Sequence, residues 1–416
     1  GPDEVSIALP DGRTAVGVIE RRFMADDGKP EGVEGYLLKP SEGRFVFRLQ
    51  PEGDLAGPVT GHILFNTDPK AYRALKGGDG KSYLTELPKG EVICLLPAAP
   101  ETAETAGDDE PQEIPAEHPS NIPIPAYQNG VIPLQSMPGT TGVIYLDFDG
   151  EPGPHEGWGN FDALPSGATN SQIREVWARV AEDFAPFKLN VTTDLRVFLD
   201  APKNSRQRCI VTPTKNAAPT AGGVAFLGSF NSTGDSPCWA FYSTGKNSAE
   251  VISHEIGHTL GLSHDGRNIT PKEEYYGGHG TGTVAWAPIM GVGYSRNLTQ
   301  WSKGEYTNAN QLQNDLNIIV SQNNSVAYRT DDAGPAHDTA AELEIFGSGT
   351  VDDEGTISHY SDVDAFRFTT IGGALNLAIS PVAQGPNLDI SAAIYDAAGN
   401  PIIVNNPARG LNATVS

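Results

Sequence analysis

The stretch V-I-S-H-E-I-G-H-T-L-G-L-S-H-D, residues 251–265, decides how the rest of the chain is interpreted. His254 and His258 are four positions apart, so on a helix both side chains project from one face, where their ring nitrogens suit a single metal ion. Gly261 favours a left-handed turn that brings His264 back as a third ligand. Three protein ligands leave one position open, which is typical of catalytic rather than structural zinc.

Glu255 lies beside the first histidine of this motif. Its carboxylate could reach a water on the metal without being a ligand, as a general base requires. A histidine pair with a glutamate also occurs by chance. The glycine and the third histidine at fixed offsets, in a chain with nine histidines, make chance a poor explanation. The pattern therefore indicates a catalytic zinc site.

The full spacing H-E-x-x-H-x-x-G-x-x-H resembles the motif of the metzincin clan of zinc endopeptidases. Asp265, which follows the third histidine, resembles the version found in the adamalysin or reprolysin-like branch and in several bacterial families. The resemblance implies a secreted bacterial hydrolase that cleaves peptide bonds with a zinc-activated water. Glu255 would take the proton of that water and return it to the leaving amine.

The order of expected elements around the motif is also similar to that of metzincins, over about 190 residues. We expect a buried strand at 143–148, a helix over 170–184, further strands up to 242, and then the metal helix. Asn247 and Glu250 form a capping pair expected to open that helix. The resemblance implies an edge strand that pairs with extended substrate, formed by Val224, Ala225, Phe226 and Leu227. An ordinary buried strand is the alternative there.

The sequence W-A-P-I-M-G, residues 286–291, follows the histidine motif. Met290 resembles the methionine turn that lies beneath the zinc ligands of metzincins; filling a gap in the core is the alternative. Tyr294 comes four residues after Met290. Where metzincins use a tyrosine here as a zinc ligand or transition-state donor, it usually comes two residues after the methionine. The spacing therefore disfavours that role for Tyr294.

The composition limits the partners of the protein. A chain of 416 residues with a net charge of -24 is a poor match for nucleic acid or anionic membranes, and it is compatible with bound calcium. No apolar run approaches the ~18 residues that span a bilayer, and the N-terminus lacks the features of a signal peptide. We expect a monomer that acts on protein or peptide substrates.

The length and the composition shifts predict several domains. Residues 1–98 alternate short apolar runs with turns, the last run at 91–96, and predict a β-sandwich or barrel that serves as pro-domain. Residues 99–138 are an acidic, proline-rich linker open to an activating protease. Residues 139–330 are the zinc peptidase domain, with a last helix at 311–320, and 331–416 are again β-rich. The predicted fold class is an α+β metzincin domain flanked by two all-β domains.

Two segments of the last region, residues 361–368 and 388–401, resemble the bacterial pre-peptidase C-terminal domain, a β-sandwich appended to secreted peptidases. That family continues into a further strand pair, so the sandwich is expected to be truncated at Ser416 or completed beyond it. Asp362 and Asp364 could bind structural calcium, but alternate aspartates that simply face solvent are the favoured interpretation.

The chain has three cysteines, and an odd number in a secreted protein leaves at least one unpaired. Cys209 and Cys238 could form a disulfide across strands of the zinc domain, which leaves Cys94 over. A Cys94 thiolate could occupy the fourth zinc position and keep the enzyme latent until the linker is cut. Such a cysteine switch occurs in several metzincin families; a buried cysteine in a β-strand is the alternative.

Two further hypotheses concern function. The chain could be a surface-binding or adhesion protein with a vestigial zinc domain, but the intact Glu255 favours an enzyme. Alternatively, the first domain of the enzyme could be a substrate-binding module rather than a pro-domain.

Overall fold

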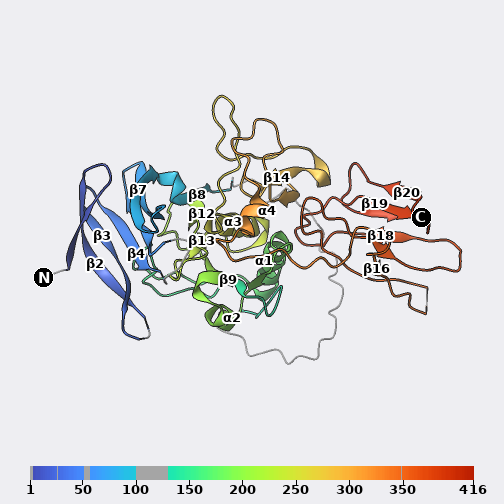
Figure 1. The fold of residues 1–416 in the computed structure, drawn as a ribbon, viewed down its shortest axis with the longest axis horizontal. Coiled ribbons are helices and arrows are strands. Elements are labelled where there is room, and N and C mark those ends of the chain that lie inside the picture. The colour runs from blue at the N-terminus through green and yellow to red at the C-terminus, as the bar shows by residue number, and fades with distance from the viewer. Residues whose placement is uncertain (1–2, 26, 51–56, 100–129, 348) are drawn as a thin grey trace.

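The computed structural model describes residues 3–25, 27–50, 57–99, 130–347 and 349–416. Three regions follow one another along the long axis in Figure 1: a sheet near the N-terminus, a central region of sheet and helices, and a β-rich C-terminal region. The histidine motif lies on and after helix α3 (Gly245–Thr259) of the central region.

The first region is an antiparallel sheet of seven strands, each paired with the next in sequence. Three register shifts interrupt the pairing of the second and third strands. Because such bulges bend and twist a sheet, the sheet curls around a cluster that includes Leu37, Phe45, Ile63 and Tyr72. The predicted all-β first region is thereby confirmed. Its strands are β1 (Glu4–Ala8), β2 (Thr14–Met24), β3 (Pro30–Lys39), β4 (Gly43–Leu49), β5 (Val59–Phe65), β6 (Lys70–Lys76) and β7 (Ser82–Pro88).

The run expected as the last strand of the first domain belongs to a different sheet. After the short helix η1 (Lys89–Glu91), strand β8 (Ile93–Pro97) pairs antiparallel with β12 (Ala221–Phe226) of the central region. Because β8 and β12 are more than a hundred residues apart in the sequence, no local pattern indicates that they pair. Most of the predicted linker, residues 100–129, lies outside the described residues.

The central sheet has the strand order β10-β9-β11-β13-β12-β8. Its first four strands run parallel, whereas β12 runs antiparallel to β13. All six residues of β12 are buried, as are those of β9, because the sheet is covered on both faces. The remaining strands of the central sheet are β9 (Gly142–Asp147), β10 (Leu189–Thr192), β11 (Arg206–Val211) and β13 (Cys238–Ala240).

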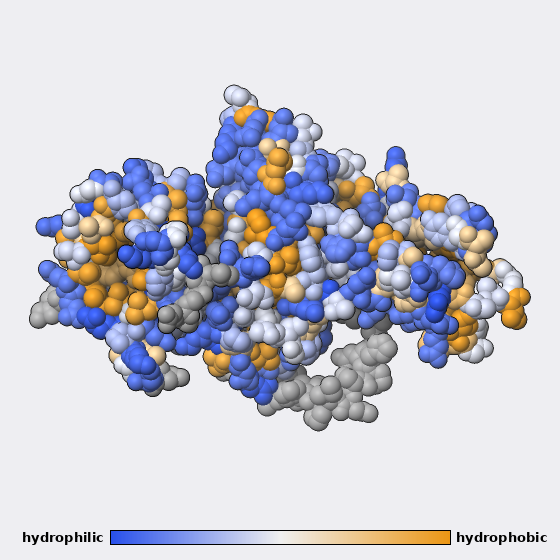
Figure 2. Space-filling model, in the orientation of Figure 1, coloured by the Kyte–Doolittle hydropathy of each residue, from blue (hydrophilic) through white to orange (hydrophobic). Residues whose placement is uncertain are grey.

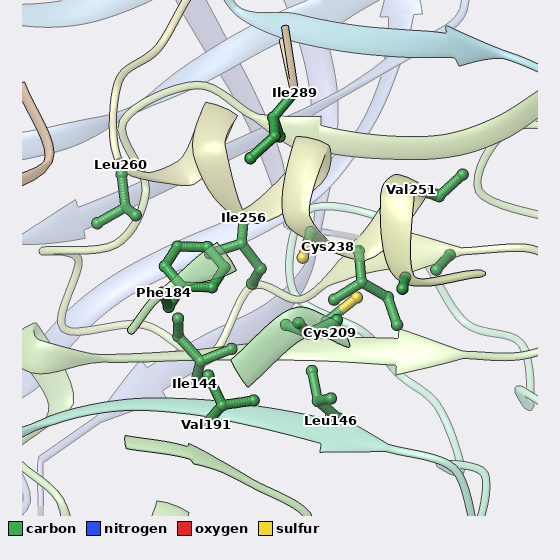
Figure 3. Close-up of a cluster of buried hydrophobic side chains, with 14 of the residues drawn as sticks. Ile144, Leu146, Phe184, Val191, Cys209, Cys238, Val251, Ile256, Leu260 and Ile289 are labelled. Carbon is green, nitrogen blue, oxygen red and sulfur yellow. The ribbon is translucent and has the colours of Figure 1, made fainter. Parts of the chain in front are cut away.

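Helices cover the two faces of this sheet. Helices α1 (Asn170–Asp183) and α3 share the main core with Ile144 and Leu146 of β9, which is seen in part in Figure 3. Helix α2 (Leu195–Asp200) packs Phe198 against Tyr145 on the opposite face, as the alternation of side chains along a strand requires. None of the helices within the described parts of the chain has the length and apolar character needed to cross a membrane.

The start of α3 differs from the sequence prediction. The helix begins at Gly245 with Thr244 as its N-cap, and Thr244 makes no side-chain capping hydrogen bond. The expected capping pair of Asn247 and Glu250 is therefore wrong. Glu250 lies within the helix and accepts a hydrogen bond from Thr299 Oγ1 at 3.1 Å instead. The carboxylate that was expected to cap the helix thus takes part in a tertiary contact.

The rest of the central region is mostly irregular chain. Strands β14 (Trp286–Pro288) and β15 (Leu298–Gln300) form a short parallel pair. Helix α4 (Asp315–Ile319) is shorter than the helix expected at 311–320. Two short 3-10 helices complete this part, η3 (Lys203–Ser205) and η4 (Gly282–Val284).

In the C-terminal region the structure describes three separate strand pairs, so the predicted pre-peptidase sandwich stays a prediction. Large apolar side chains are exposed on them, including Ile402 and Val404, and Figure 2 shows apolar residues at the surface of this region. The pairs are β16 (Ala341–Glu342) with β17 (Phe366–Arg367), β18 (Leu377–Ile379) with β21 (Ala413–Val415), and β19 (Ala392–Tyr395) with β20 (Pro401–Asn405).

Buried polar contacts join the first region to the loop after β9. Arg48 forms a bidentate pair with Glu156, with N to O distances of 2.9 and 2.6 Å, and the two side chains are only 11% and 6% exposed. Glu34 accepts a hydrogen bond from the backbone N–H of Gly157 and pairs with Arg21. The first region is therefore docked through charges that have little access to water.

We expect Arg48→Ala to lower the free energy of unfolding by about 3–5 kcal/mol, because Glu156 would remain buried without its cation. Calorimetric or denaturant unfolding measures this loss. Arg22→Ala is the matched control, since the Arg22–Asp3 pair is 54% and 61% exposed and should contribute less than about 1 kcal/mol. Equal losses of unfolding free energy in the two variants would contradict a larger stabilising contribution from the buried pair.

Candidate metal centre

Helix α3 places His254 and His258 at the centre of the molecule, each 1% exposed. Their Nε2 atoms are 3.0 Å apart. The Nδ1 atom of His254 lies 2.9 Å from the carbonyl oxygen of Ile289, and that of His258 lies 2.7 Å from that of Leu262. Because carbonyl oxygens only accept, each Nδ1 carries the proton and each Nε2 presents a lone pair to the same point.

His264 reaches that point by a change of chain direction. Gly261 has a φ of +100°, a conformation that glycine adopts without steric cost. The ring of His264 then lies 4.7 Å from that of His258 and 5.4 Å from that of His254. Burial lowers the pKa of His254 to about 3 and of His264 to about 4. The imidazoles are therefore neutral at physiological pH, as metal ligands must be.

Cys94, on β8, joins the three histidines. Its Sγ atom is 2.6 Å from Nε2 of His264, and the thiol is buried. One ligand atom from each of the four side chains lies within 4.8 Å of the others. Three imidazole nitrogens and one sulfur are a donor set that tetrahedral zinc accepts. Burial raises the pKa of the Cys94 thiol, so a bound cation would be needed to hold it as thiolate.

Glu255 is wholly buried, and among the described residues neither carboxylate oxygen has a hydrogen-bond partner. Gly223 on β12 makes room for it, since a Cβ at Gly223 would lie 2.7 Å from Glu255 Oε1. Burial raises the pKa of this carboxyl. A buried carboxyl without a partner costs free energy, which a metal, its water and a substrate in the adjacent space would offset. The residues present thus fit zinc.

Asp265 holds the third histidine's loop in place. Its backbone N–H donates to the carbonyl of Met290 at 2.9 Å, and its carboxylate accepts from Gln311 and Tyr306 at 2.8 and 3.1 Å. Met290 is fully buried, and its Sδ lies 2.5 Å from where a Cβ on Gly257 would be. The methionine therefore packs directly against α3, at the residue before His258.

Asp183, at the end of α1, supports the metal helix from behind, and sequence reasoning missed it. Its carboxylate accepts from Ser253 Oγ at 2.5 Å, one residue before His254, and from Asn387 Nδ2 of the C-terminal region at 2.8 Å. Burial and the nearby Glu250 raise the pKa of Asp183 to about 8. Only its position at the end of an apolar stripe could have drawn attention to this residue.

The predicted substrate strand, Val224 to Leu227, lies largely in β12, and its outer edge is covered by β8. The register pairs Ala225 with Cys94 and Val224 with Leu95. Two tyrosine hydroxyls hold the same segment, one from Tyr275 to the Leu95 carbonyl at 2.8 Å and one from Tyr294 to the Pro97 carbonyl at 3.0 Å. Sequence reasoning had given Tyr275 no role, because its contact partners are distant in sequence.

Leu96 is buried beside the metal centre. The side chain is 2% exposed, whereas Leu95, which points the other way, is 48% exposed. This alternation is that of an extended strand. Around this position Leu96 lies with Glu250, His254, Ile289, Gly291, Val292, Gly293 and Tyr294.

Cys209 and Cys238 face each other on the paired strands β11 and β13, in the same register position. Both are fully buried, and the structure has all three cysteines as free thiols. Figure 3 shows the two sulfur atoms within the core beneath α3. The two cysteines are neighbours in the structure but are not bonded, and the predicted disulfide stays a prediction.

The aspartates considered for calcium separate into two groups. Asp364 lies with Asp331 and Asp332, with carboxylate oxygens within 4.8 Å of one another. Asp362 instead accepts hydrogen bonds from the backbone and side chain of Ser358. An exposed acidic group is common without an ion, so calcium stays a prediction.

We expect Gly257→Ala to destabilise the protein by about 1–3 kcal/mol, the usual cost of overpacking a core. The added Cβ would meet Met290 Sδ at 2.5 Å and the Trp301 ring at 3.2 Å. Thermal unfolding and zinc content of the purified variant measure the effect. A second change, Met290→Ala, should restore part of the zinc content by making room. If the second change restores no zinc content, a direct contact between Gly257 of the helix and Met290 is contradicted.

Comparison with known proteins gives a match over part of the chain. Residues 170–302 match the family model Reprolysin_5, Metallo-peptidase family M12. The matched segment includes His254, Glu255, His258 and His264, whereas Cys94 lies outside it. No curated protein matches the chain. Peptidases of this family use zinc, and the four side chains gathered here could hold a metal ion. The match and the site together support a metzincin-type, zinc-dependent peptidase domain of the M12 type at residues 170–302.

Proposed function

We propose that the protein is a secreted zinc endopeptidase made as a latent zymogen, in which Cys94 and β8 close the active site. The observation that carries this proposal is the approach of Cys94 Sγ to His264 within a group of four potential ligands. Resemblance to secreted peptidases and the net charge of -24 support secretion. A binding or adhesion protein without catalytic activity would not require a glutamate buried beside the four potential metal ligands, as Glu255 is.

The chain's own residues account for the steps of hydrolysis. When bound, zinc would polarise the peptide carbonyl and make its water acidic enough to ionise near neutral pH. Glu255 takes a proton from the attacking water and returns it to the leaving nitrogen. Once β8 has left, the edge of β12 that it covers would align an extended substrate through backbone pairing.

Latency follows from competition for one site. β8 pairs with the same edge of β12 that a substrate strand would need, and Leu96 is buried beside His254 and Tyr294. Because β8 belongs to the same chain as the site that it covers, it competes with substrate as an intramolecular ligand. Cleavage in the predicted linker, residues 99–138, would remove this advantage, so that β8 dissociates together with the first region and substrate replaces it.

Glu255→Gln is expected to reduce kcat/KM for a denatured protein substrate by about 10²–10⁴-fold, because proton transfer in the transition state is lost. The assay uses protein cleaved between the two regions, and metal analysis should show unchanged zinc. Glu175→Gln, on the exposed side of α1, is the matched control and should retain full activity. Equal activity of wild type and Glu255→Gln would refute the mechanism.

Cys94→Ala is expected to raise the activity of the uncut chain at least about tenfold, which corresponds to the loss of about 1.4 kcal/mol of inhibitory interaction. Leu95→Ala, at the half-exposed next position, should leave the uncut chain latent. In cobalt-substituted wild type, sulfur-to-cobalt charge transfer in the absorption spectrum should appear and vanish in Cys94→Ala. An uncut Cys94→Ala protein with no gain would favour a substrate-binding role for the first region.

A further inference from the structure

Tyr275 lies against the metal centre without being one of its four potential ligands. Its ring centroid is 4.3 Å from that of His264 and 6.3 Å from that of His254. The residue belongs to the irregular chain between the histidine motif and Met290. Packing against two ligand rings fixes where the phenol can point, so the position of its hydroxyl is defined by the site itself.

That hydroxyl donates to a peptide carbonyl in the occupied cleft. The Tyr275 oxygen is 2.8 Å from the carbonyl oxygen of Leu95. The Leu95 carbonyl follows directly after the residue whose Sγ contacts His264. The hydroxyl therefore lies where the strand that fills the cleft passes the metal ligands, which is where a carbonyl must be held for hydrolysis.

Tyr294 has a different position along the same strand. Its hydroxyl donates to the carbonyl of Pro97, two residues beyond Leu95, at 3.0 Å. Its ring lies 6.4 Å from that of Tyr242, whose oxygen accepts the backbone N–H of Ala99. Tyr294 and Tyr242 thus hold the strand on the carboxyl side of the metal centre, while Tyr275 acts at the centre.

We propose that Tyr275 is a catalytic residue of the peptidase: its hydroxyl donates a hydrogen bond to the carbonyl oxygen of the bond being cleaved. Tyr294 holds the substrate backbone on the leaving side. This assignment rests on the proposed endopeptidase function and on a substrate strand that takes the place of β8 along β12.

The role is electrostatic, and the reaction balances without further reagents. The water oxygen forms a bond to the carbonyl carbon, and the bond from that carbon to nitrogen then breaks. Glu255 carries one proton from the water to the leaving nitrogen. Tyr275 keeps its own proton and donates only a hydrogen bond to the oxygen on which negative charge develops. Such a donor acts mainly in the transition state, so its loss lowers kcat more than it raises KM.

The test uses the full chain cleaved between the first and central regions, with Tyr275→Phe and Tyr294→Phe compared side by side. Removal of one oxyanion donor typically costs about 10²–10³ in kcat. We expect a fall of about 10²-fold in kcat for Tyr275→Phe with little change in KM. Tyr294→Phe should mainly raise KM. Both variants remove only an oxygen atom, and zinc content with thermal unfolding checks that both are folded and loaded.

A phosphinic peptide gives a second readout, because its tetrahedral oxygens mimic the developing anion. Its affinity should fall in Tyr275→Phe by about the same factor as kcat/KM, and it should change less in Tyr294→Phe. If wild type is active and Tyr275→Phe is equally active, or binds the phosphinic peptide with unchanged affinity, the role of Tyr275 is overturned. The proposed endopeptidase function would not be affected by that result. Cleaved wild type that hydrolyses no peptide would overturn the proposed function itself.

Discussion

The burial of α3 is the constraint on which the rest of the structure depends. Helix α3 carries two histidines and a glutamate in the interior of the protein. The segments that pack against it must therefore come close to the helix and still leave space for these polar side chains. Gly223 on β12 and Gly257 on the helix provide this on two sides, since a Cβ at either position would collide with Glu255 or Met290. The missing side chains at Gly223 and Gly257 thus leave room for the polar groups of the metal centre in an otherwise packed core. A shift of the helix would remove this room.

Polar contacts from distant parts of the chain fix the helix at this depth. Asp183 binds Ser253 directly before the first histidine and is itself held by Asn387 from the C-terminal region. Asp265 connects the third histidine's loop to the methionine turn. Each contact satisfies a buried polar group that would otherwise be costly. The C-terminal region therefore contributes to the support of the metal helix, whatever else it binds.

Sequence reasoning succeeded where the signal is local and failed where it depends on tertiary pairing. The spacing of His254, His258 and His264 encodes their convergence, because helix periodicity and one glycine turn fix it. The all-β first region likewise follows from short alternating runs. The destination of β8 could not be predicted, since an edge strand accepts any extended segment that reaches it. Tyr275 and Asp183 were missed for a related reason: each is defined by a partner more than 60 residues away.

On the proposed function, inhibition and substrate binding use the same contacts. β8 takes the edge of β12, the buried position of Leu96 beside His254, and the hydroxyls of Tyr275 and Tyr294, all of which a substrate strand would need. What distinguishes the inhibitor is the Cys94 thiol, which lies at the ligand atoms where a reacting water would otherwise be. Any change that strengthens backbone binding in the cleft must then also strengthen latency. Under the proposed function, selectivity between the two states comes from the thiol and from the docking of the first region, to which the buried Arg48–Glu156 pair contributes.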